Sequence, residues 1–200
     1  MKLYAISDLH LRHTENHQAL AALAPRPDDW LIVGGDVGET LADMDLMLRT
    51  LTARFRQVVW VPGNHELWSM PSEQPPLRGE ARYLRMVDLC HRYGALTPED
   101  PYPRWPGDGP HRHYPLRYEH VRLPRIPRFS IWCGTRLTED WHTRYRAEVV
   151  VTGHLHMPAT LWRDGVRFEE VSLGYPQQWR HRGGLERCLR EVLPGPEKSA

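Results

Sequence analysis

Four short apolar stretches of this 200-residue chain each end in side chains that can bind a metal ion. These are residues 2–7 before Asp8 and His10, 30–34 before Asp36, 57–61 before Asn64 and His65, and 147–152 before His154 and His156. Short β-branched or aromatic runs of this kind are typical of buried parallel strands. Because ligands of open α/β sheets gather at the carboxyl ends of the strands, we expect these side chains to converge on one rim of a sheet.

Helical patterns separate the predicted strands and indicate an α/β fold. Residues 14–24, 40–55 and 78–93 carry apolar side chains at helical spacing, with Thr14 as a possible cap of the first helix and Gly94 as the stop of the third. Alternation of strands and helices predicts a parallel sheet covered by helices. Residues 138–146 are expected to form a further helix capped by Thr138, and Asp164-Gly165 predicts a β-hairpin between residues 160–163 and 166–171.

The remaining segments have little regular pattern. Residues 95–127 hold eight of the eighteen prolines and are predicted to be an irregular loop, followed by a short strand at residues 129–133. From Arg180 onward the chain is rich in Arg, Gly and Pro, and we expect a frayed surface helix followed by disorder. A chain of this length and 40% hydrophobic content supports one core, so we predict one domain over residues 1–179 and an Arg-rich tail over residues 180–200.

Composition excludes several classes of function. The 26 Lys and Arg residues nearly balance the 25 Asp and Glu residues, which argues against a nucleic-acid or membrane-surface protein. The chain shows neither a signal peptide nor an apolar run long enough to span a membrane, so a soluble, cytoplasmic protein is expected. Three cysteines without Cys-x-x-Cys spacing indicate neither a disulfide framework nor a structural zinc site.

The side chains at the predicted strand ends favour a particular group of metals. Carboxylates with imidazoles and no thiolate suit divalent Mn, Fe or Zn better than an all-oxygen Mg or Ca site. Asp36 follows Gly34-Gly35, where the chain can turn tightly, and could bridge two ions. Two ions about 3.5–4 Å apart polarise a phosphoryl oxygen and generate a bridging hydroxide for in-line attack. His65 lies next to a predicted ligand and is the candidate catalytic acid for the leaving oxygen.

Each motif also has a plainer interpretation when it is taken alone. Asp8-x-His10 could be a buried hydrogen-bonded pair, and Gly35-Asp36 could be a turn. Gly-Asn-His-Glu at residues 63–66 could be a turn with an Asx cap, and Gly-His-Leu-His at residues 153–156 could be an outward-facing strand. The occurrence of all four motifs at predicted strand ends favours the metal site.

In this order, Asp8-x-His10, Gly35-Asp36-x-x-Glu39, Gly63-Asn64-His65-Glu66 and Gly153-His154-x-His156 resemble the motifs of the calcineurin-like metallophosphoesterase superfamily. The resemblance extends from residue 1 to about residue 175 and implies a four-layer α/β/β/α sandwich with two metal ions at the sheet edges. It implies that Asp8, His10, Asp36 and His156 hold one ion, and that Asp36, Asn64 and His154 hold the other. It also assigns the catalytic histidine to His65.

The family has one more histidine ligand, between the third and last motifs. His113, followed by Tyr114 and Pro115, fits this pattern. However, residues 105–112 cannot form the buried strand expected before such a ligand, so the sequence indicates an internal deletion near residues 106–111 and a shortened sheet. His113 is therefore either a metal ligand or an exposed loop imidazole.

Three functions remain open at this point. The first is a phosphomonoesterase or phosphodiesterase with two metals, and the resemblance to a bacterial subgroup suggests phosphopantetheine on a carrier-protein serine as the substrate. The second is a catalytically weak metal- or partner-binding remnant that oligomerises through exposed sheet edges. The third, a nuclease, lacks the expected basic stripe interleaved with aromatic residues. Candidate phosphate contacts are Arg125, Arg128 and Arg136, although the favoured interpretation of each is a solvated surface residue.

Overall fold

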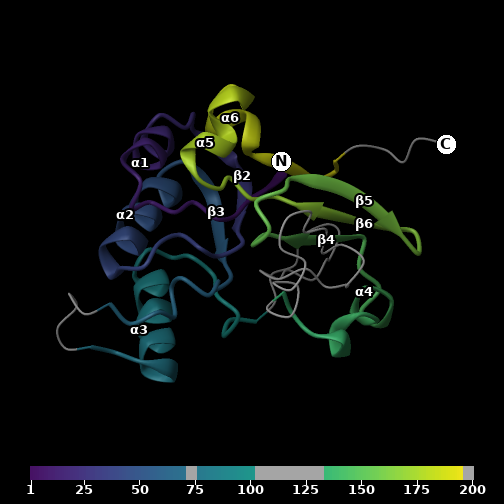
Figure 1. The fold of residues 1–200 in the computed structure, drawn as a ribbon, viewed down its shortest axis with the longest axis horizontal. Coiled ribbons are helices and arrows are strands. Elements are labelled where there is room, and N and C mark those ends of the chain that lie inside the picture. The colour runs from purple at the N-terminus through teal and green to yellow at the C-terminus, as the bar shows by residue number, and fades with distance from the viewer. Residues whose placement is uncertain (71–75, 102–132, 196–200) are drawn as a thin grey trace.

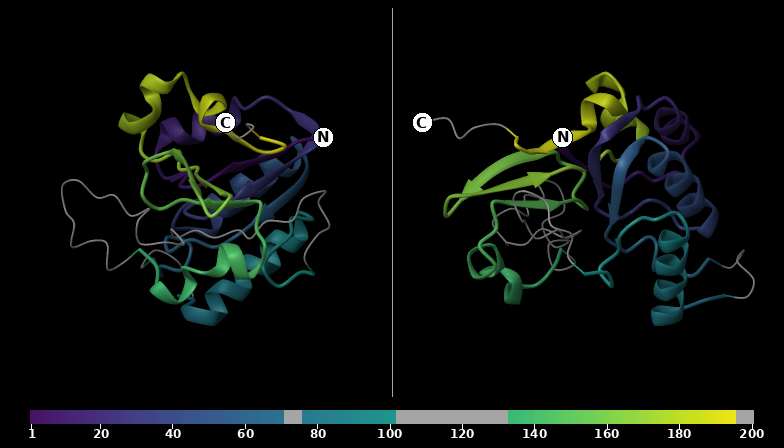
Figure 2. Two further views of the ribbon diagram at one scale, coloured as in Figure 1. Left: turned by 90° about the vertical axis from the view of Figure 1, so that its right-hand side faces the viewer. Right: turned by 180° about the vertical axis from the view of Figure 1, so that it is seen from behind.

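The computed structural model describes residues 1–70, 76–101 and 133–195, in which two β-sheets lie face to face with helices outside them (Figure 1). The helices α1, α2 and α3 lie beside the first sheet, and α4 lies beside the second (Figure 2). The described part of the chain thus has the α/β/β/α layering that the sequence resemblance implies.

The first sheet has the strand order β3-β2-β1-β7. Its parallel strands are β1 (Leu3–Ile6), β2 (Arg26–Val33) and β3 (Phe55–Trp60). Ile6 pairs with Val33, and Val33 pairs with Trp60. The three carboxyl ends are therefore level, and the residues that follow them emerge side by side.

Three helices cover one face of this sheet, namely α1 (Thr14–Ala21), α2 (Leu41–Thr52) and α3 (Gly79–Arg92). The core beneath them includes Met44, Leu48 and Met86 with Trp60 of the sheet. Thr40 begins α2 in a capping box with Asp43. The prediction that Thr14 caps α1 is wrong: His13 is the N-cap, and no side chain caps this helix.

The second sheet has the order β4-β6-β5 and contains β4 (Val149–Thr152), β5 (Ala159–Arg163) and β6 (Val166–Glu170). The predicted hairpin at Asp164-Gly165 joins β5 to β6, and both turn residues have positive φ. Alternate side chains such as Val149 and Val151 pack against Leu3 and Ala5 of the first sheet.

The outer face of the second sheet packs against α4 (Trp141–Arg144). Val150 and Phe168 are buried there, with Trp141 packed against them. A 3₁₀ turn, Arg136–Thr138, precedes α4. Because Asp140 is the N-cap of α4, the prediction that Thr138 caps a helix starting there is wrong.

The chain continues through α5 (Pro176–Trp179), a 3₁₀ turn (Arg180–Arg182) and α6 (Leu185–Cys188), and then enters β7 (Arg190–Leu193). β7 pairs antiparallel with β1 (Figure 2). Val192 of this strand is fully buried. The expected frayed helix and disorder from Arg180 onward are therefore wrong for residues 190–193. The four residues of this strand, Arg-Glu-Val-Leu, are too few to show a strand pattern in the sequence.

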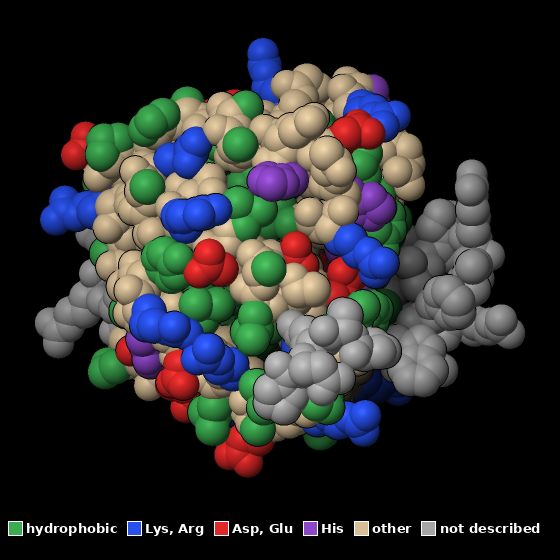
Figure 3. Space-filling model, turned by 90° about the vertical axis from the view of Figure 1, so that its left-hand side faces the viewer, with side chains coloured by type: hydrophobic (Ala, Val, Ile, Leu, Met, Phe, Trp, Pro, Cys, Tyr) green, Lys and Arg blue, Asp and Glu red, His purple; other side chains and the backbone are tan. Residues whose placement is uncertain are grey.

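Other predictions concern segments that are described only in part. The predicted loop at residues 95–127 is described to residue 101, and within it Leu96 forms an isolated bridge with Val59. Of the predicted strand at residues 129–133, only Cys133 is among the described residues. None of the described helices is long and apolar enough to cross a membrane. On the face seen in Figure 3, basic and acidic side chains are interspersed, in line with the small net charge.

Candidate metal centre

The loops that follow β1, β2, β3 and β4 are joined by hydrogen bonds. The backbone N–H of Asp8 donates to the carbonyl of Gly35 at 2.9 Å, and that of His10 donates to the carbonyl of Asp36 at 3.1 Å. The backbone N–H of His65 donates to Asp36 Oδ1 at 3.0 Å. The four predicted motifs thus meet at one rim, because the backbone N–H of His154 also donates to Asp8 Oδ2 at 2.9 Å.

Backbone strain is concentrated at the same residues. The described part of the chain has seven non-glycine residues with positive φ, and five of them are predicted metal ligands. These five are Asp8, His10, Asp36, His154 and His156. Such conformations cost about 1–3 kcal/mol each, persist where the surrounding structure fixes them, and gather at functional sites.

One group of ligand atoms is formed by Asp8, His10 and His156. Asp8 and His10 are buried, and His156 is nearly so. His156 Nε2 lies 3.0 Å from Asp8 Oδ1 and 3.1 Å from His10 Nε2, and His10 Nε2 lies 3.9 Å from the same oxygen. Two imidazole nitrogens and one carboxylate oxygen therefore face a common point.

The other oxygen of Asp8 is held by the protein. Asp8 Oδ2 accepts hydrogen bonds from Ser7 Oγ at 2.6 Å and from Ser172 Oγ at 2.9 Å, in addition to the backbone N–H of His154. His154 also makes a longer contact of 3.2 Å with Oδ1. These bonds fix the carboxylate and turn Oδ1 toward the two imidazoles.

A hydrogen bond to Gln178 fixes the tautomer of His156. Its Nδ1 lies 3.0 Å from Gln178 Oε1, and the backbone N–H of Tyr175 donates to that same atom at 2.7 Å. A backbone donor needs an acceptor, so this atom is the amide oxygen and Nδ1 must carry a proton. Nε2 of the neutral ring is then left with the lone pair that a metal ion requires.

The two imidazoles of this group titrate differently. Burial lowers the pKa of His10 to about 4, so its ring is neutral at ordinary pH. Burial also acts to lower the pKa of His156, but the hydrogen bond and charge of Asp8, with Gln178, outweigh it and raise that pKa. The position between His156 Nε2 and Asp8 Oδ1 therefore favours a positive charge. A proton occupies it in the metal-free protein, and a bound metal ion would displace that proton.

His10, Asp36 and His65 form a second group, whose ligand atoms all lie within 4.8 Å of one another. His65 Nδ1 lies 2.9 Å from Glu39 Oε1, and its Nε2 lies 3.9 Å from Asp36 Oδ2. Glu39 can only accept when ionised, so Nδ1 carries a proton and Nε2 faces the carboxylate of Asp36. The ring of Trp68 lies against His65, with centroids 3.9 Å apart.

Glu66 has a structural role. Its buried carboxylate accepts hydrogen bonds from the backbone N–H groups of Asp36 at 3.1 Å, Val37 at 2.6 Å and Gly63 at 3.0 Å. Buried Arg82 of α3 donates to the carbonyl oxygens of Glu66 and Glu39. Together they hold the loops after β2 and β3 in place.

The remaining predicted residues have different outcomes. Asn64 is half-buried in the loop after β3, and the ring of His154 belongs to neither of the two groups. His113, Arg125 and Arg128 lie outside the described residues. Arg136 is exposed in the 3₁₀ turn before α4, as its solvated alternative predicts.

Sequence reasoning did not find Gln178, Ser172 or Tyr175. The ring of Tyr175 stacks on His10, with centroids 4.8 Å apart and planes 28° apart. All three residues belong to the segment after β6, which the sequence patterns do not connect with the metal motifs. The sequence Gly174-Tyr175-Pro176 does indicate a turn after an apolar run, and this turn is the feature that could have drawn attention to the segment.

The residues present fit a divalent ion of the Mn, Fe or Zn kind. They offer carboxylate and imidazole donors, a neutral His10 ring, a His156 ring whose Nδ1–H leaves Nε2 to face the ion, and an Asp8 carboxylate oriented by hydrogen bonds. We refer to Asp8, His10, Asp36, His65 and His156 together as the candidate metal centre.

This chain belongs to the calcineurin-like phosphoesterase family, whose sequence model matches residues 1–158. It is accordingly a phosphoric ester hydrolase of a class that uses divalent metal ions, as the sequence predicts. It is 36% identical over 273 residues to the [acyl-carrier-protein] phosphodiesterase PptH of Mycobacterium tuberculosis, a match that covers 98% of this chain and 84% of the relative.

The fold is similar to the crystal structure of phosphopantetheinyl hydrolase (PptH) from Mycobacterium tuberculosis. The TM-score is 0.91 at 35% sequence identity, and the match covers 100% of this chain and 98% of that chain. The sequence match extends over more residues than the 200 of this chain, so the relative has residues that this chain lacks. This is consistent with the internal deletion that the sequence indicates.

Proposed function

We propose that this protein hydrolyses the phosphodiester between a phosphopantetheine arm and a serine of a carrier protein, using two divalent ions, with Mn, Fe and Zn as the candidates. The observation that carries the proposal is the 36% identity to an acyl-carrier-protein phosphodiesterase across 98% of the chain. The TM-score of 0.91 with phosphopantetheinyl hydrolase supports the same substrate. The cytoplasmic location predicted from the sequence is part of this proposal.

We assign Asp8, His10, Asp36 and His156 to one ion, and Asp36, Asn64, His154 and His113 to the other. The 3.0 and 3.1 Å contacts of His156 with Asp8 and His10 support the first set. The second set rests on the family resemblance, with Asp36 as the bridging ligand.

The reaction is the addition of one water to the phosphodiester. When bound, two ions of this kind polarise the phosphoryl oxygens and lower the pKa of a water near them. The water oxygen forms a bond to phosphorus while the bond between phosphorus and the serine oxygen breaks. The serine oxygen takes a proton from Nε2 of His65 in the form of the ring that is protonated on both nitrogens, with Nδ1–H held by Glu39 at 2.9 Å. The proton that the attacking water loses restores this form of the ring. The products are 4′-phosphopantetheine and the free serine hydroxyl.

The test is to incubate a phosphopantetheinylated acyl carrier protein with this chain and Mn²⁺, and to follow the carrier by mass spectrometry. We expect conversion to the apo carrier and no conversion after chelation. Hydrolysis of bis(p-nitrophenyl) phosphate without conversion of the carrier would keep the enzyme class and reject the substrate. A folded, metal-loaded sample that hydrolyses neither compound would instead support the catalytically weak remnant.

A further inference from the structure

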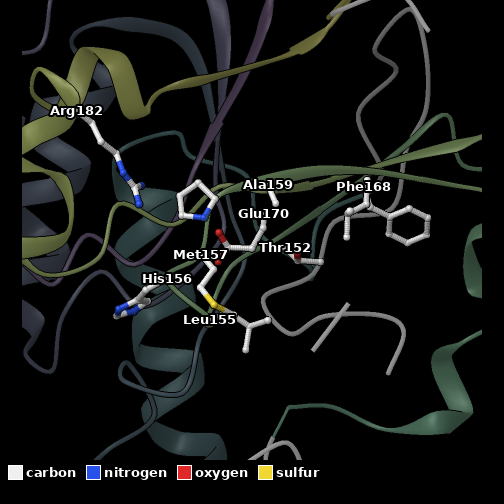
Figure 4. A pocket seen from close by; sticks show the side chains of 10 residues that line it. Thr152, Leu155, His156, Met157, Ala159, Phe168, Glu170 and Arg182 are labelled. Atoms are coloured by element: carbon white, nitrogen blue, oxygen red, sulfur yellow. The ribbon is translucent and has the colours of Figure 1, made fainter. Parts of the chain in front are cut away.

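A pocket of about 460 Å³ lies beside the candidate metal centre (Figure 4). Its described lining comes from the end of β4, the following loop, β5, β6 and the 3₁₀ turn after α5: Thr152, Leu155, His156, Met157, Pro158, Ala159, Leu161, Phe168, Glu170 and Arg182. His156 belongs both to this lining and to the candidate metal centre. The pocket therefore adjoins the candidate metal centre at His156.

Strand register explains why these side chains share one face of the second sheet. Ala159 pairs with Glu170, Leu161 pairs with Phe168, and Thr152 pairs with Glu170 from the other side. Paired residues and residues two apart point to the same face. This is the outer face, which α4 covers near Val150 and Phe168 and which the pocket hollows near Glu170.

The pocket is elongated and mainly apolar. In Figure 4 the labelled side chains extend from His156 and Arg182 at one end to Phe168 at the other. Its volume is within the range of about 300–1,000 Å³ that is usual for small-molecule sites. An extended ligand suits this arrangement of side chains better than a compact one.

One buried carboxylate oxygen in the pocket lacks a partner. Glu170 is 8% exposed; its Oε1 contacts Ser172 Oγ, the hydroxyl that donates to Asp8, while its Oε2 has no hydrogen-bond partner among the described residues. In Figure 4 the carboxylate points toward Met157 and the end of the pocket where His156 lies. A buried polar atom left unpaired is costly, so an N–H or O–H group of a ligand in the pocket would be stabilised there.

We propose that this pocket binds the pantetheine arm of the substrate, an inference that rests on the proposed function and extends it to the specificity site. Apolar walls from Leu155, Met157 and Leu161 suit the methyl and methylene groups of the arm. Glu170 Oε2 accepts from an amide N–H or hydroxyl of the arm, and the Arg182 guanidinium at the rim donates to its carbonyl oxygens. His156 marks the end at which the arm's phosphate meets the candidate metal centre.

Binding of pantetheine itself tests the pocket without hydrolysis. Pantetheine has no phosphate and is titrated, with reductant present, into metal-loaded protein by isothermal calorimetry. We expect the wild type to bind it, and Ala159→Phe, which adds a ring beside Glu170, to raise the Kd at least tenfold. The matched control Thr160→Phe adds the same bulk to the opposite, exposed side of β5 and should leave the Kd unchanged.

A second variant and a second substrate make the outcome decisive. Leu161→Trp narrows the same pocket, which covers the case in which Ala159→Phe does not fold. For both variants the ratio of kcat/KM on phosphopantetheinylated carrier to kcat/KM on bis(p-nitrophenyl) phosphate should fall at least tenfold. The inference is overturned if the wild type does not bind pantetheine, or if both folded variants keep the wild-type Kd and ratio.

The two proposals can fail separately. If pantetheine binds and the pocket variants weaken binding, but the carrier protein is not hydrolysed, then the pocket inference holds and the proposed function fails. If the carrier protein is hydrolysed but pantetheine does not bind, then the proposed function holds and the pocket inference fails.

Discussion

Two glycines leave room for the carboxylates of the candidate metal centre. A Cβ on Gly63 would lie 2.2 Å from Asp36 Oδ1, and a Cβ on Gly153 would lie 2.4 Å from Asp8 Oδ2. Real Cβ atoms do not approach other atoms this closely, so any side chain at these positions must displace a carboxylate. We therefore expect substitution of either glycine to disturb metal binding.

Gly153→Ala should lose metal because the new methyl group displaces Asp8. We expect less than half the wild-type metal content, measured by mass spectrometry of the bound elements, and a similar loss of hydrolysis. Gly165→Ala is the control: its φ is +79° and nothing lies within 4 Å of the added Cβ, so it strains the backbone without crowding a ligand. Wild-type metal content in folded Gly153→Ala would refute this explanation.

His65→Ala should separate catalysis from metal binding. If His65 protonates the leaving oxygen, turnover falls about 10²–10⁴-fold while the metal content is unchanged. Glu39→Gln keeps a hydrogen-bond acceptor for His65 Nδ1 and should reduce turnover much less. Loss of metal in His65→Ala would show that His65 is a ligand, which its place in the group with His10 and Asp36 allows.

Glu170 should make the stability of the metal-free protein depend on pH. Burial raises its pKa from 4.5 to about 7, so the folded state holds this proton more tightly than the unfolded state. The resulting stabilisation is present below pH 4.5 and is lost as the pH rises through 7. As the pH rises through this range, the unfolding free energy of Glu170→Gln should therefore increase by up to about 3 kcal/mol relative to that of the wild type. Urea denaturation at several pH values measures this difference, and a difference that does not change with pH would contradict the prediction.

At the scale of elements, α1 holds the segment that supplies Tyr175 and Gln178. The buried side chain of Asn16 donates to the carbonyl oxygens of Leu9 at 2.7 Å and Gly174 at 3.0 Å. Its Oδ1 accepts from Trp179 Nε1 at 2.9 Å. One residue of α1 thus joins the loop after β1 to the loop after β6 and to α5.

Asn16→Ala should destabilise the whole fold. It leaves two carbonyl oxygens and one indole N–H without this partner, and each unsatisfied buried group costs about 1–3 kcal/mol. We expect a loss of at least about 2 kcal/mol in urea denaturation. His17→Ala, at the next and exposed position of the same helix, should change the stability little. Equal stabilities of the two variants would contradict this role.

The sequence predicts the elements whose pattern is local. Parallel strands are recognisable because their apolar runs stop abruptly before Asp8, Asp36 and Asn64, and α2 is recognisable from its apolar spacing. By contrast, β7 depends on pairing with residues of β1 that lie 185 to 190 positions away in the sequence, and its four residues are too few to indicate a strand. The position of β7 is therefore set by long-range strand pairing, which a local sequence pattern does not reveal.

The same distinction applies to the candidate metal centre. The sequence brings together Asp8, His10, Asp36, His65 and His156 because each follows a recognisable strand. Gln178 escapes notice, since its role arises only when α5 lies against His156. The assignment of His113 is still a prediction, because that residue lies outside the described part of the chain.

At the scale of the whole molecule, the two sheets are joined next to the candidate metal centre. Ser7 and Ser172 form a bridge between the end of β1 and the segment after β6. The backbone N–H of Ser7 donates to the carbonyl of Val171 at 3.1 Å, and that of Gly174 donates to the carbonyl of Asp8 at 3.0 Å. Metal binding at Asp8 and His156 would therefore tie both sheets together.

The sheet edges bear on the predicted self-association. Among the described strands, β5 is an edge of the second sheet, and Trp162 on it is 40% exposed. Exposed edge strands favour pairing with another chain, and oligomerisation through such an edge remains a prediction. Light scattering of the wild type and of Trp162→Lys would test it.

The most direct test of the central claim is a titration of metal-free protein with Mn²⁺. Bound metal and conversion of a phosphopantetheinylated carrier are measured in the same samples. We predict that conversion is absent in the chelated protein and reaches its maximum only when two ions are bound per chain. Conversion that persists in chelator, or that is complete with one bound ion, would contradict a two-metal phosphodiesterase.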